Sequence, residues 1–337
     1  MSGRAVAVAG GAPRRRAARA CLGACVVACL AACAASGPVP GAAGRSAVPS
    51  VSGSPPPRGA AAAFPDPLRL AGVPFVSQPD WQCGPASLAM AMAAAGRDVP
   101  VQTLAASAFV PGLKGALQAE MLAATRRQGL LATELAPSLD ALRAELAGGL
   151  PVIVLQNLGL PAFPRWHYAV LIGVDLARGD VLLHSGAVAS DTMPLATFER
   201  TWARAGRWAM VVTPPARLAA SADEARAARA VVGLERVDSA GAAAGWEAMV
   251  ARWPAGRIAR FARGNARLAR GDAPGAAEDY RAALATDPAF ADAWNNLARA
   301  LAAQGDPAGA LGAADRAVAL GGVRADTYRA TRAGLGP

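Results

Sequence analysis

Two kinds of residue in this chain have the chemistry of a nucleophile and of a proton carrier, and both are scarce. The 337 residues include five cysteines and two histidines. Four of the cysteines lie within the first 33 residues, so Cys83 is the single thiol of the remaining chain. A thiolate attacks carbonyl carbon readily, and an imidazole carries protons near neutral pH. Cys83 paired with His167 or His184 therefore predicts nucleophilic catalysis.

Cys83 lies where a helix is expected to begin. Pro85 suits the first helical turn, and the residues from 84 to 95 contain no further breaker before Gly96. The unpaired N–H groups and the dipole at a helix N-terminus stabilise a thiolate. We therefore predict that this position lowers the pKa of the Cys83 thiol.

The two histidines lie on adjacent predicted strands. His167 opens the apolar run 167–175, and His184 lies within 180–185, so a short hairpin turn joins the two strands. The exposed end of a strand, opposite a helix that begins with a cysteine, is where papain-like enzymes carry their histidine. Further helices are expected at 100–107, 115–128 and 138–147, and further strands at 151–157 and 207–213. Helices first and an antiparallel sheet afterwards indicate an α+β domain.

The motifs around both residues resemble the double-glycine leader peptidases that process bacteriocins, in a free-standing form. The first motif reads Gln-x4-Cys-Gly-Pro from Gln78, and the second reads His-Tyr-x-Val-Leu-x-Gly from His167. The resemblance covers roughly residues 70–215 and implies a papain-like α+β fold. It implies Cys83 as the nucleophile and His167 as the general base and acid. Gln78 would donate to the oxyanion beside the Cys83 amide, and Gln82 is a second candidate for that donor.

The sequence departs from the family pattern at one place. The family usually has an Asp-Pro pair after the histidine strand, and the aspartate orients the imidazole. Here the place reads His184-Ser185, and neither residue supplies a fixed negative charge. Either could orient His167 by a hydrogen bond, and Asp175 and Asp191 are further candidates. Because this carboxylate is missing, a second interpretation remains, in which the domain binds peptides and no longer cuts them.

Other kinds of chemistry find little support in the sequence. The net charge is +10, but five arginines lie in the first 33 residues and aromatic residues make up only 5%. The clustered basic surface and stacking residues of a nucleic-acid binder are missing, so we expect no nucleic-acid partner. His167 and His184 have no second thiol near them for a zinc site, and residues 112–115 do not form a phosphate-binding loop. We expect neither a metal nor a cofactor.

The first residues have the order of a secretory signal. The basic stretch Arg14–Arg16 precedes an apolar run from Ala20 to Ala32, which is too short for a stable membrane span. The run ends in Leu-Ala-Ala-Cys, which resembles the bacterial lipobox and predicts a signal peptide over 1–32 with lipidation of Cys33. Plain secretion is the alternative. Residues 33–66 are rich in proline, glycine and serine and predict a disordered tether.

This leader also predicts a location. A lipidated cysteine would anchor the protein to a membrane of the cell envelope. Ala34, rather than an aspartate, follows Cys33, which by resemblance to sorted lipoproteins favours the periplasmic face of the outer membrane.

The C-terminal part of the chain repeats itself with a period of 34 residues. Gly271-Asp272 recurs as Gly305-Asp306, and Trp294 recurs as Tyr328. This period, with small and large residues alternating, resembles the tetratricopeptide repeat, which implies a binding surface for a protein or peptide. We therefore expect a papain-like peptidase domain over 67–216 and an all-α repeat domain over 217–337. The expected repeat units cover 221–254, 257–288 and 291–322.

Five arginines mark the first helix of the second unit, from Arg257 to Arg270. They predict either a solvated face or a groove for an acidic peptide or an anionic lipid.

Together these features predict a lipid-anchored cysteine peptidase that hydrolyses peptide bonds, after small residues such as Gly-Gly if the resemblance extends to specificity. The repeats would recruit the substrate or a partner. The alternatives are a non-catalytic envelope scaffold and an amidase or acyltransferase acting on cell-wall peptide.

Overall fold

The computed structural model describes residues 64–77, 82–110, 112 and 115–336. Two predictions, the lipidation of Cys33 and the role of Gln78, fall outside the described residues. The predicted signal peptide lies outside them as well, and so does almost all of the predicted tether.

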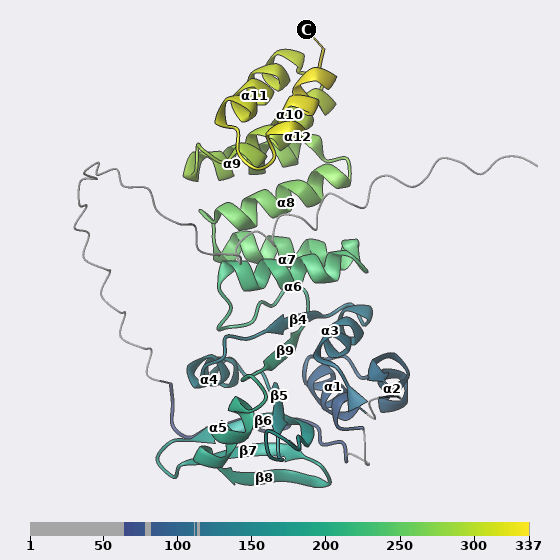
Figure 1. Ribbon diagram of the computed structural model, residues 1–337, viewed down its shortest axis with the longest axis vertical. Helices are drawn as coiled ribbons and strands as arrows, with labels where there is room; N and C mark the ends of the chain where they lie inside the picture. Colours follow the sequence, from purple (N-terminus) through teal and green to yellow (C-terminus); the bar gives the residue numbers. More distant parts are fainter. Residues whose placement is uncertain (1–63, 78–81, 111, 113–114, 337) are drawn as a thin grey trace, which may run out of the picture. The chain divides into compact units, whose positions relative to one another are not determined.

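One antiparallel sheet of seven strands forms the centre of the N-terminal part (Figure 1). Six strands lie in the order β4-β9-β5-β6-β7-β8, and β1 pairs with β6. Their bounds are Leu68–Arg69 (β1), Leu131–Glu134 (β4), Val152–Asn157 (β5), Trp166–Asp175 (β6), Asp180–Ser185 (β7), Val188–Pro194 (β8) and Ala209–Thr213 (β9). Strands β5 and β6 are buried along most of their length because helices cover both faces of the sheet.

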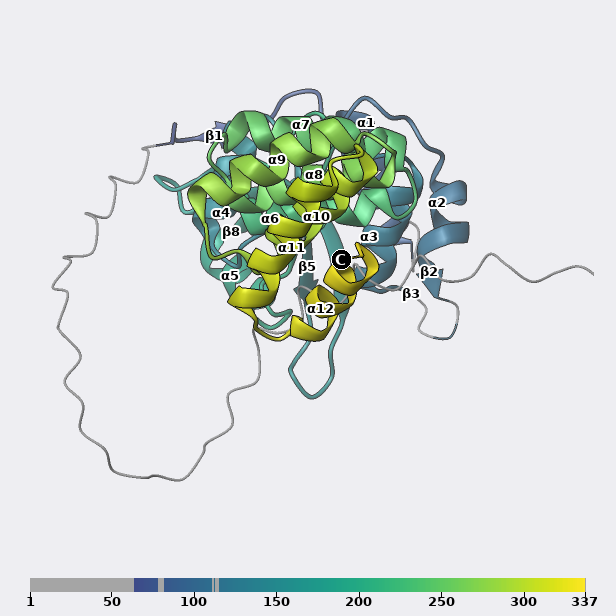
Figure 2. The same ribbon diagram turned by 90° about the horizontal axis from the view of Figure 1, so that it is seen from above.

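Helices cover the two faces of this sheet in two groups (Figures 1 and 2). One group is α1 (Cys83–Ala94), α2 (Val101–Ala108) and α3 (Gln118–Arg127), whose apolar side chains join one core with Ile153 and Val170. The other group is α4 (Leu139–Ala147) and α5 (Leu195–Ala203), which join a second core with Val154 and Leu171. Neighbouring residues of one strand thus belong to opposite cores, as the two-residue period of a strand requires. A short hairpin of β2 (Phe109–Val110) and β3 (Gly115–Ala116) follows α2.

The helices and strands predicted for this domain are confirmed to within a few residues, but six elements were missed: the two-residue strands β1, β2 and β3, and β4, β8 and α5. Strand β4 has only four residues. Strand β8 lies at the sheet edge and exposes most of its polar residues, so it lacks the apolar alternation that identifies a strand. Helix α5 directly follows Pro194 and was hidden in the same polar stretch.

Seven helices make up the C-terminal part, and consecutive helices pack against each other (Figure 1). They are α6 (Glu224–Glu235), α7 (Ser239–Arg252), α8 (Arg257–Ala269), α9 (Ala273–Thr286), α10 (Ala291–Ala303), α11 (Pro307–Leu320) and α12 (Ala325–Gly334). Small residues allow close packing: a Cβ on Gly264 of α8 would lie 2.7 Å from the Tyr280 ring of α9.

The 34-residue period has a physical basis at the helix starts. Asp238, Asp272 and Asp306 are the N-caps of α7, α9 and α11. Each carboxylate accepts a hydrogen bond from the backbone N–H of the glycine three residues later. The cap therefore recurs in all three units, including the first, where the other sequence signals are weak.

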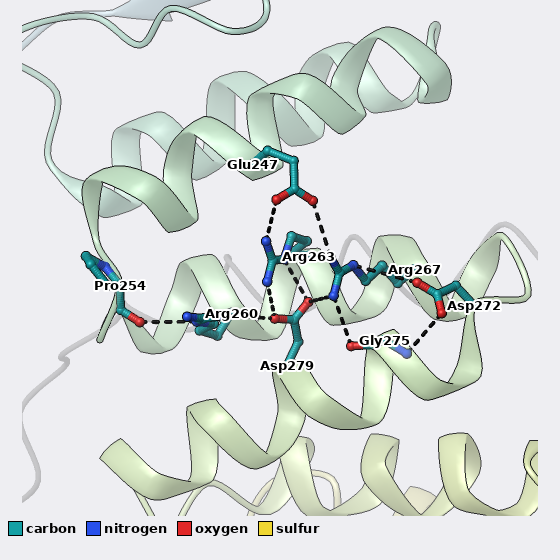
Figure 3. A network of polar contacts seen from close by, with 8 residues as sticks. All are labelled: Glu247, Pro254, Arg260, Arg263, Arg267, Asp272, Gly275 and Asp279. Atoms are coloured by element: carbon teal, nitrogen blue, oxygen red, sulfur yellow. Dashed lines mark hydrogen bonds and ion pairs between the residues drawn. The ribbon is translucent and has the colours of Figure 1, made fainter.

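A buried carboxylate neutralises the arginine-rich helix α8 (Figure 3). Asp279 of α9 is fully buried and accepts from Arg263 Nε at 2.8 Å and Nη2 at 2.6 Å. Arg260 and Arg267 each approach the same carboxylate to 3.2 Å, and Glu247 of α7 bonds to Arg263 and Arg267. The sequence predicted that the arginines of this helix form either a solvated face or a binding groove. Arg260, Arg263 and Arg267 instead pair with the buried carboxylate of Asp279 inside the repeat.

The segment before α6 is bound to helix α4. Glu145 is fully buried and accepts from the amides of Ala220 at 2.9 Å and Ser221 at 2.7 Å, and from Ser221 Oγ at 2.6 Å. Apolar residues of α6, among them Val231 and Leu234, belong to the same core as β4 and β9. The core of the sheet therefore continues into the first repeat helices.

Candidate active site

Cys83 is the first residue of α1, as predicted. Its side chain is partly buried. The backbone amide of Tyr168 on β6 hydrogen-bonds the Cys83 sulfur, and the amides of Gly84 and of Cys83 itself also act on it. The fold therefore brings the sulfur to the residue that directly follows His167 on its strand.

Close packing of the start of α1 brings the sulfur to this place. Gly84 is buried, and a Cβ there would lie 2.8 Å from Ala116 Cβ and 3.1 Å from Met121 Sδ. The hydroxyl of Tyr168 donates to the carbonyl of Ala116 at 3.1 Å. Any side chain at position 84 would push α1 away from β3 and α3, and with it the sulfur away from β6.

Ser185, and not His184, contacts the ring of His167. His167 Nε2 and Ser185 Oγ lie 2.8 Å apart and share a hydrogen bond. Both ring nitrogens of His184 are engaged elsewhere: Nδ1 accepts from the amide of Ser190 at 3.1 Å, and Nε2 donates to the carbonyl of Val73 at 3.1 Å. His184 is therefore a buried histidine that holds the segment before α1 against the sheet.

The two aspartates considered as orienting residues do not reach the site. Asp175 is at the other end of β6, eight residues from His167 or about 26 Å along the strand. Its carboxylate accepts from the amide of Arg178. Asp191 lies on the edge strand β8, opposite Leu183, and makes no hydrogen bond with His167.

Burial determines the protonation states of both candidate catalytic groups. It raises the pKa of the Cys83 thiol, and the three backbone amides at the sulfur only partly oppose this. It lowers the pKa of His167, and the positive charge of Arg165 adds to that effect. The prediction that the helix N-terminus lowers the pKa of Cys83 is wrong in its net direction, because loss of water around the sulfur outweighs the amide contacts. At neutral pH the resting site therefore holds a neutral thiol and a neutral imidazole.

The two glutamines proposed as oxyanion donors cannot be compared directly. Gln78 lies outside the described residues. Gln82 is the N-cap residue of α1, is half-buried, and accepts from the amide of Ala86 through its backbone carbonyl at 3.0 Å. It therefore adjoins Cys83, and the choice between the two residues stays a prediction.

Sequence reasoning missed Gln156 on β5, which lies directly opposite His167 in the strand register. Its side chain is fully buried, its Nε2 donates to Thr201 Oγ1 at 2.7 Å, and its Oε1 has no hydrogen-bond partner among the described residues. Buried polar atoms are usually paired, and Gln156 Oε1 is one of seven buried side-chain atoms among the described residues that are not. A polar residue within the apolar run of β5 was the available signal.

Neither a metal centre nor a membrane span is found in the part of the chain that the structure describes. No three acidic, histidine or cysteine side chains among those residues are close enough to hold a metal ion. None of the described helices combines the length and apolar character needed to cross a bilayer.

The fold is an α/β sheet domain followed by helical repeats, and both parts match known families. Residues 70–210 match the Peptidase_C39-like family, and residues 226–289 and 261–326 match the tetratricopeptide repeat. The sheet domain is thus similar to C39-like peptidases and the helical part to tetratricopeptide repeats, as the resemblance predicted.

Solved structures resemble each part separately. A C39-like peptidase from Bacillus anthracis is 21% identical and covers 44% of this chain and 98% of its own, with a TM-score of 0.38. A double-glycine motif protease from an AMS/PCAT transporter, solved with its leader peptide, is 23% identical over 43% of this chain and 96% of its own, with a TM-score of 0.35. The TPR2B domain of yeast Sti1, solved in an Hsp70 complex, is 24% identical over 33% of this chain and 95% of its own, with a TM-score of 0.31. No curated protein matches the chain.

Replacing Ser185 by aspartate is expected to activate the thiol. A carboxylate beside His167 Nε2 raises the histidine pKa by about 1–3 units and favours the thiolate–imidazolium pair. We expect iodoacetamide to alkylate Cys83 at least about tenfold faster at pH 7 in Ser185→Asp than in the wild type. Ser185→Asn is the matched control, because it keeps a polar partner without the charge. Equal alkylation rates in the two variants would contradict the role of charge.

Proposed function

We propose that the protein is a cysteine peptidase of the bacterial cell envelope, with Cys83 as nucleophile and His167 as general base and acid. The observation that carries the proposal is the position of the Cys83 sulfur at the backbone amide of Tyr168, the residue next to His167, although His167 follows Cys83 by 84 positions in the chain. The C39-like family match and the hydrogen bond between His167 and Ser185 support it.

The reaction follows from the neutral resting pair. His167 takes the thiol proton while the sulfur of Cys83 bonds to the substrate's carbonyl carbon. The C–N bond then breaks, and His167 gives the proton to the departing amine. In the second half, water loses a proton to His167 and adds to the thioester carbon. The C–S bond breaks, and the proton returns to the sulfur, which restores the resting site.

The backbone amide of Cys83 is the proposed donor to the oxyanion, together with the side chain of Gln78. The thiol and the imidazole start neutral, so the proposed role of Ser185 is to orient the ring rather than to hold a charge.

The location of the enzyme is also a proposal. The lipobox-like sequence at Cys33 supports a lipid anchor, and the composition of residues 34–66 supports a flexible tether between anchor and enzyme. The repeats would bind the substrate or a partner protein, as this class of repeat generally does.

The test is the appearance of new N-termini when the full chain, lacking only its signal, is incubated with a peptide library. We expect the wild type to release them and Cys83→Ser to release at least about a thousandfold fewer. Equal release by both would show that Cys83 is not the nucleophile.

One observation favours a second candidate, a non-catalytic scaffold. Among the described residues, no carboxylate bonds to His167, so nothing there holds an imidazolium in place. If the wild type cuts neither the library nor purified cell-wall peptide, the scaffold is the better description. Release of wall fragments without library cleavage would instead indicate an amidase.

A further inference from the structure

A cavity of about 640 Å³ lies where the sheet domain meets the first repeat. Four segments line it: residues 95–97 after α1, residues 126–130 around the end of α3, Pro214 and Pro215 after β9, and Val237 and Asp238 between α6 and α7. We call it the junction cavity. Its volume is in the range of sites that hold a small organic molecule.

The lining of the junction cavity carries an excess of positive charge. Arg97, Arg126 and Arg127 line it, and Asp238 is the acidic residue in the same lining. One oxygen of the Asp238 carboxylate already caps α7. Arg127 donates to the carbonyl of Ser107 at 2.7 Å, a contact that leaves its charge in place. None of the three arginines has a carboxylate partner among the described residues.

Helix α6 fixes the guanidinium of Arg126, the last residue but one of α3. A Cβ on Gly233 of α6 would lie 2.5 Å from both Cζ and Nε of Arg126, so the guanidinium packs where residue 233 has no side chain. Its Nε is buried without a hydrogen-bond partner, and no contact of the other nitrogens is found among the described residues. Burial, and then the positive charge of Arg236, lower the pKa of Arg126.

This arrangement calls for an acceptor that the described residues do not supply. The carbonyl end of α3 favours an arginine, but it does not explain one that is held against another helix without a partner. A guanidinium matches the two oxygens of a carboxylate or a phosphate. We propose that the junction cavity binds a small molecule with a phosphate or carboxylate group, and that Arg126 holds this group. Leu130, Pro214 and Pro215 supply an apolar wall for the rest of the molecule.

The junction cavity is separate from the candidate active site. Cys83 is the first residue of α1, whereas the lining residues Ala95 and Gly96 directly follow its last residue. A helix of 12 residues is about 18 Å long. The inference therefore goes beyond the proposed peptidase function, and Cys83→Ser should bind the ligand as the wild type does.

The experiment titrates three probes into the full chain, lacking only its signal, and follows binding by calorimetry. Phenyl phosphate and benzoate place a phosphate or a carboxylate on an aromatic ring, and benzyl alcohol is the neutral comparison. We expect at least one of the two anions to bind with a Kd of about 1 mM or tighter. Benzyl alcohol should not bind in this range.

Two variants test the role of Arg126. Arg126→Gln should weaken binding of the anion at least about tenfold. Gly233→Ala should weaken it as well, because the added methyl group displaces the guanidinium while the arginine remains. The matched controls are Arg316→Gln, at an exposed arginine on α11, and Gly312→Ala, where a Cβ would have no neighbour within 4 Å.

The stability of Arg126→Gln shows whether lost binding is a loss of the fold. The change removes a partly buried charge that has no partner, so without ligand the variant should unfold at the same temperature as the wild type or higher.

The outcomes decide the inference and identify the group that is bound. Binding of phenyl phosphate alone assigns a phosphate, and binding of benzoate alone assigns a carboxylate. The inference is wrong if neither anion binds up to about 10 mM, or if benzyl alcohol binds equally well. Full affinity in Arg126→Gln or in Gly233→Ala overturns it too, as does an equal loss in Arg316→Gln, which would indicate attraction by net charge.

Discussion

Replacing His167 by alanine is expected to lower kcat/KM for any cleaved peptide by at least about a thousandfold. The variant retains the nucleophile but loses the group that takes the thiol proton and returns it to the leaving amine. Because burial raises the pKa of Cys83, the sulfur without a base stays protonated at neutral pH. The loss should shrink as the pH rises, since hydroxide then forms part of the thiolate.

The same variant gives a second readout that does not depend on knowing the substrate. In the wild type, iodoacetamide should label Cys83 faster at pH 7 than in His167→Ala, and the two rates should converge at alkaline pH. His184→Ala is the comparison, because the ring of His184 bonds to Val73 and Ser190 and not to His167. Equal labelling of wild type and His167→Ala over the whole pH range would favour the scaffold.

Replacing Asp279 by asparagine is expected to destabilise the protein by about 3–5 kcal/mol. The carboxylate is fully buried and bonds Arg263 through two nitrogens, with Arg260 and Arg267 close by. The variant keeps the shape of the side chain but leaves the arginine charges without their buried partner. Urea unfolding followed by tryptophan fluorescence would measure the change.

Asp315→Asn is the comparison for that measurement. Asp315 makes one ion pair with Arg332, and its side chain is 60% exposed. An exposed pair contributes at most about 1 kcal/mol. A similar small effect at Asp279 would mean that the glutamate on α7, Glu247, carries the arginine charges by itself.

Much of the fold could be predicted because the residues that determine it are close in sequence. The long apolar strands β5 and β6 and the helix after Cys83 each carry a local signal that survives in the structure. The repeats were visible because a helix pair recurs every 34 residues. The edge strand β8 was missed because its pairing with β7 is made by the backbone and leaves little trace in its polar side chains.

The site shows where sequence reasoning ended. Residue types identified Cys83 and His167, but the partner of the imidazole depended on which of two neighbours, His184 or Ser185, shared its sheet face. The direction of the thiol pKa depended on how much water the packing excludes, which no local motif encodes. Gln156 was recognised as a neighbour of His167 only from the register of β5 with β6, which places the two residues opposite each other.

The contact between Glu145 and the segment before α6 has a consequence for how the protein unfolds. A chain cut before residue 217 would lose the donors of Glu145 and would expose the apolar residues that α6 covers. The sheet domain and the first repeat are therefore expected to lose their structure in one cooperative step, because they share one core.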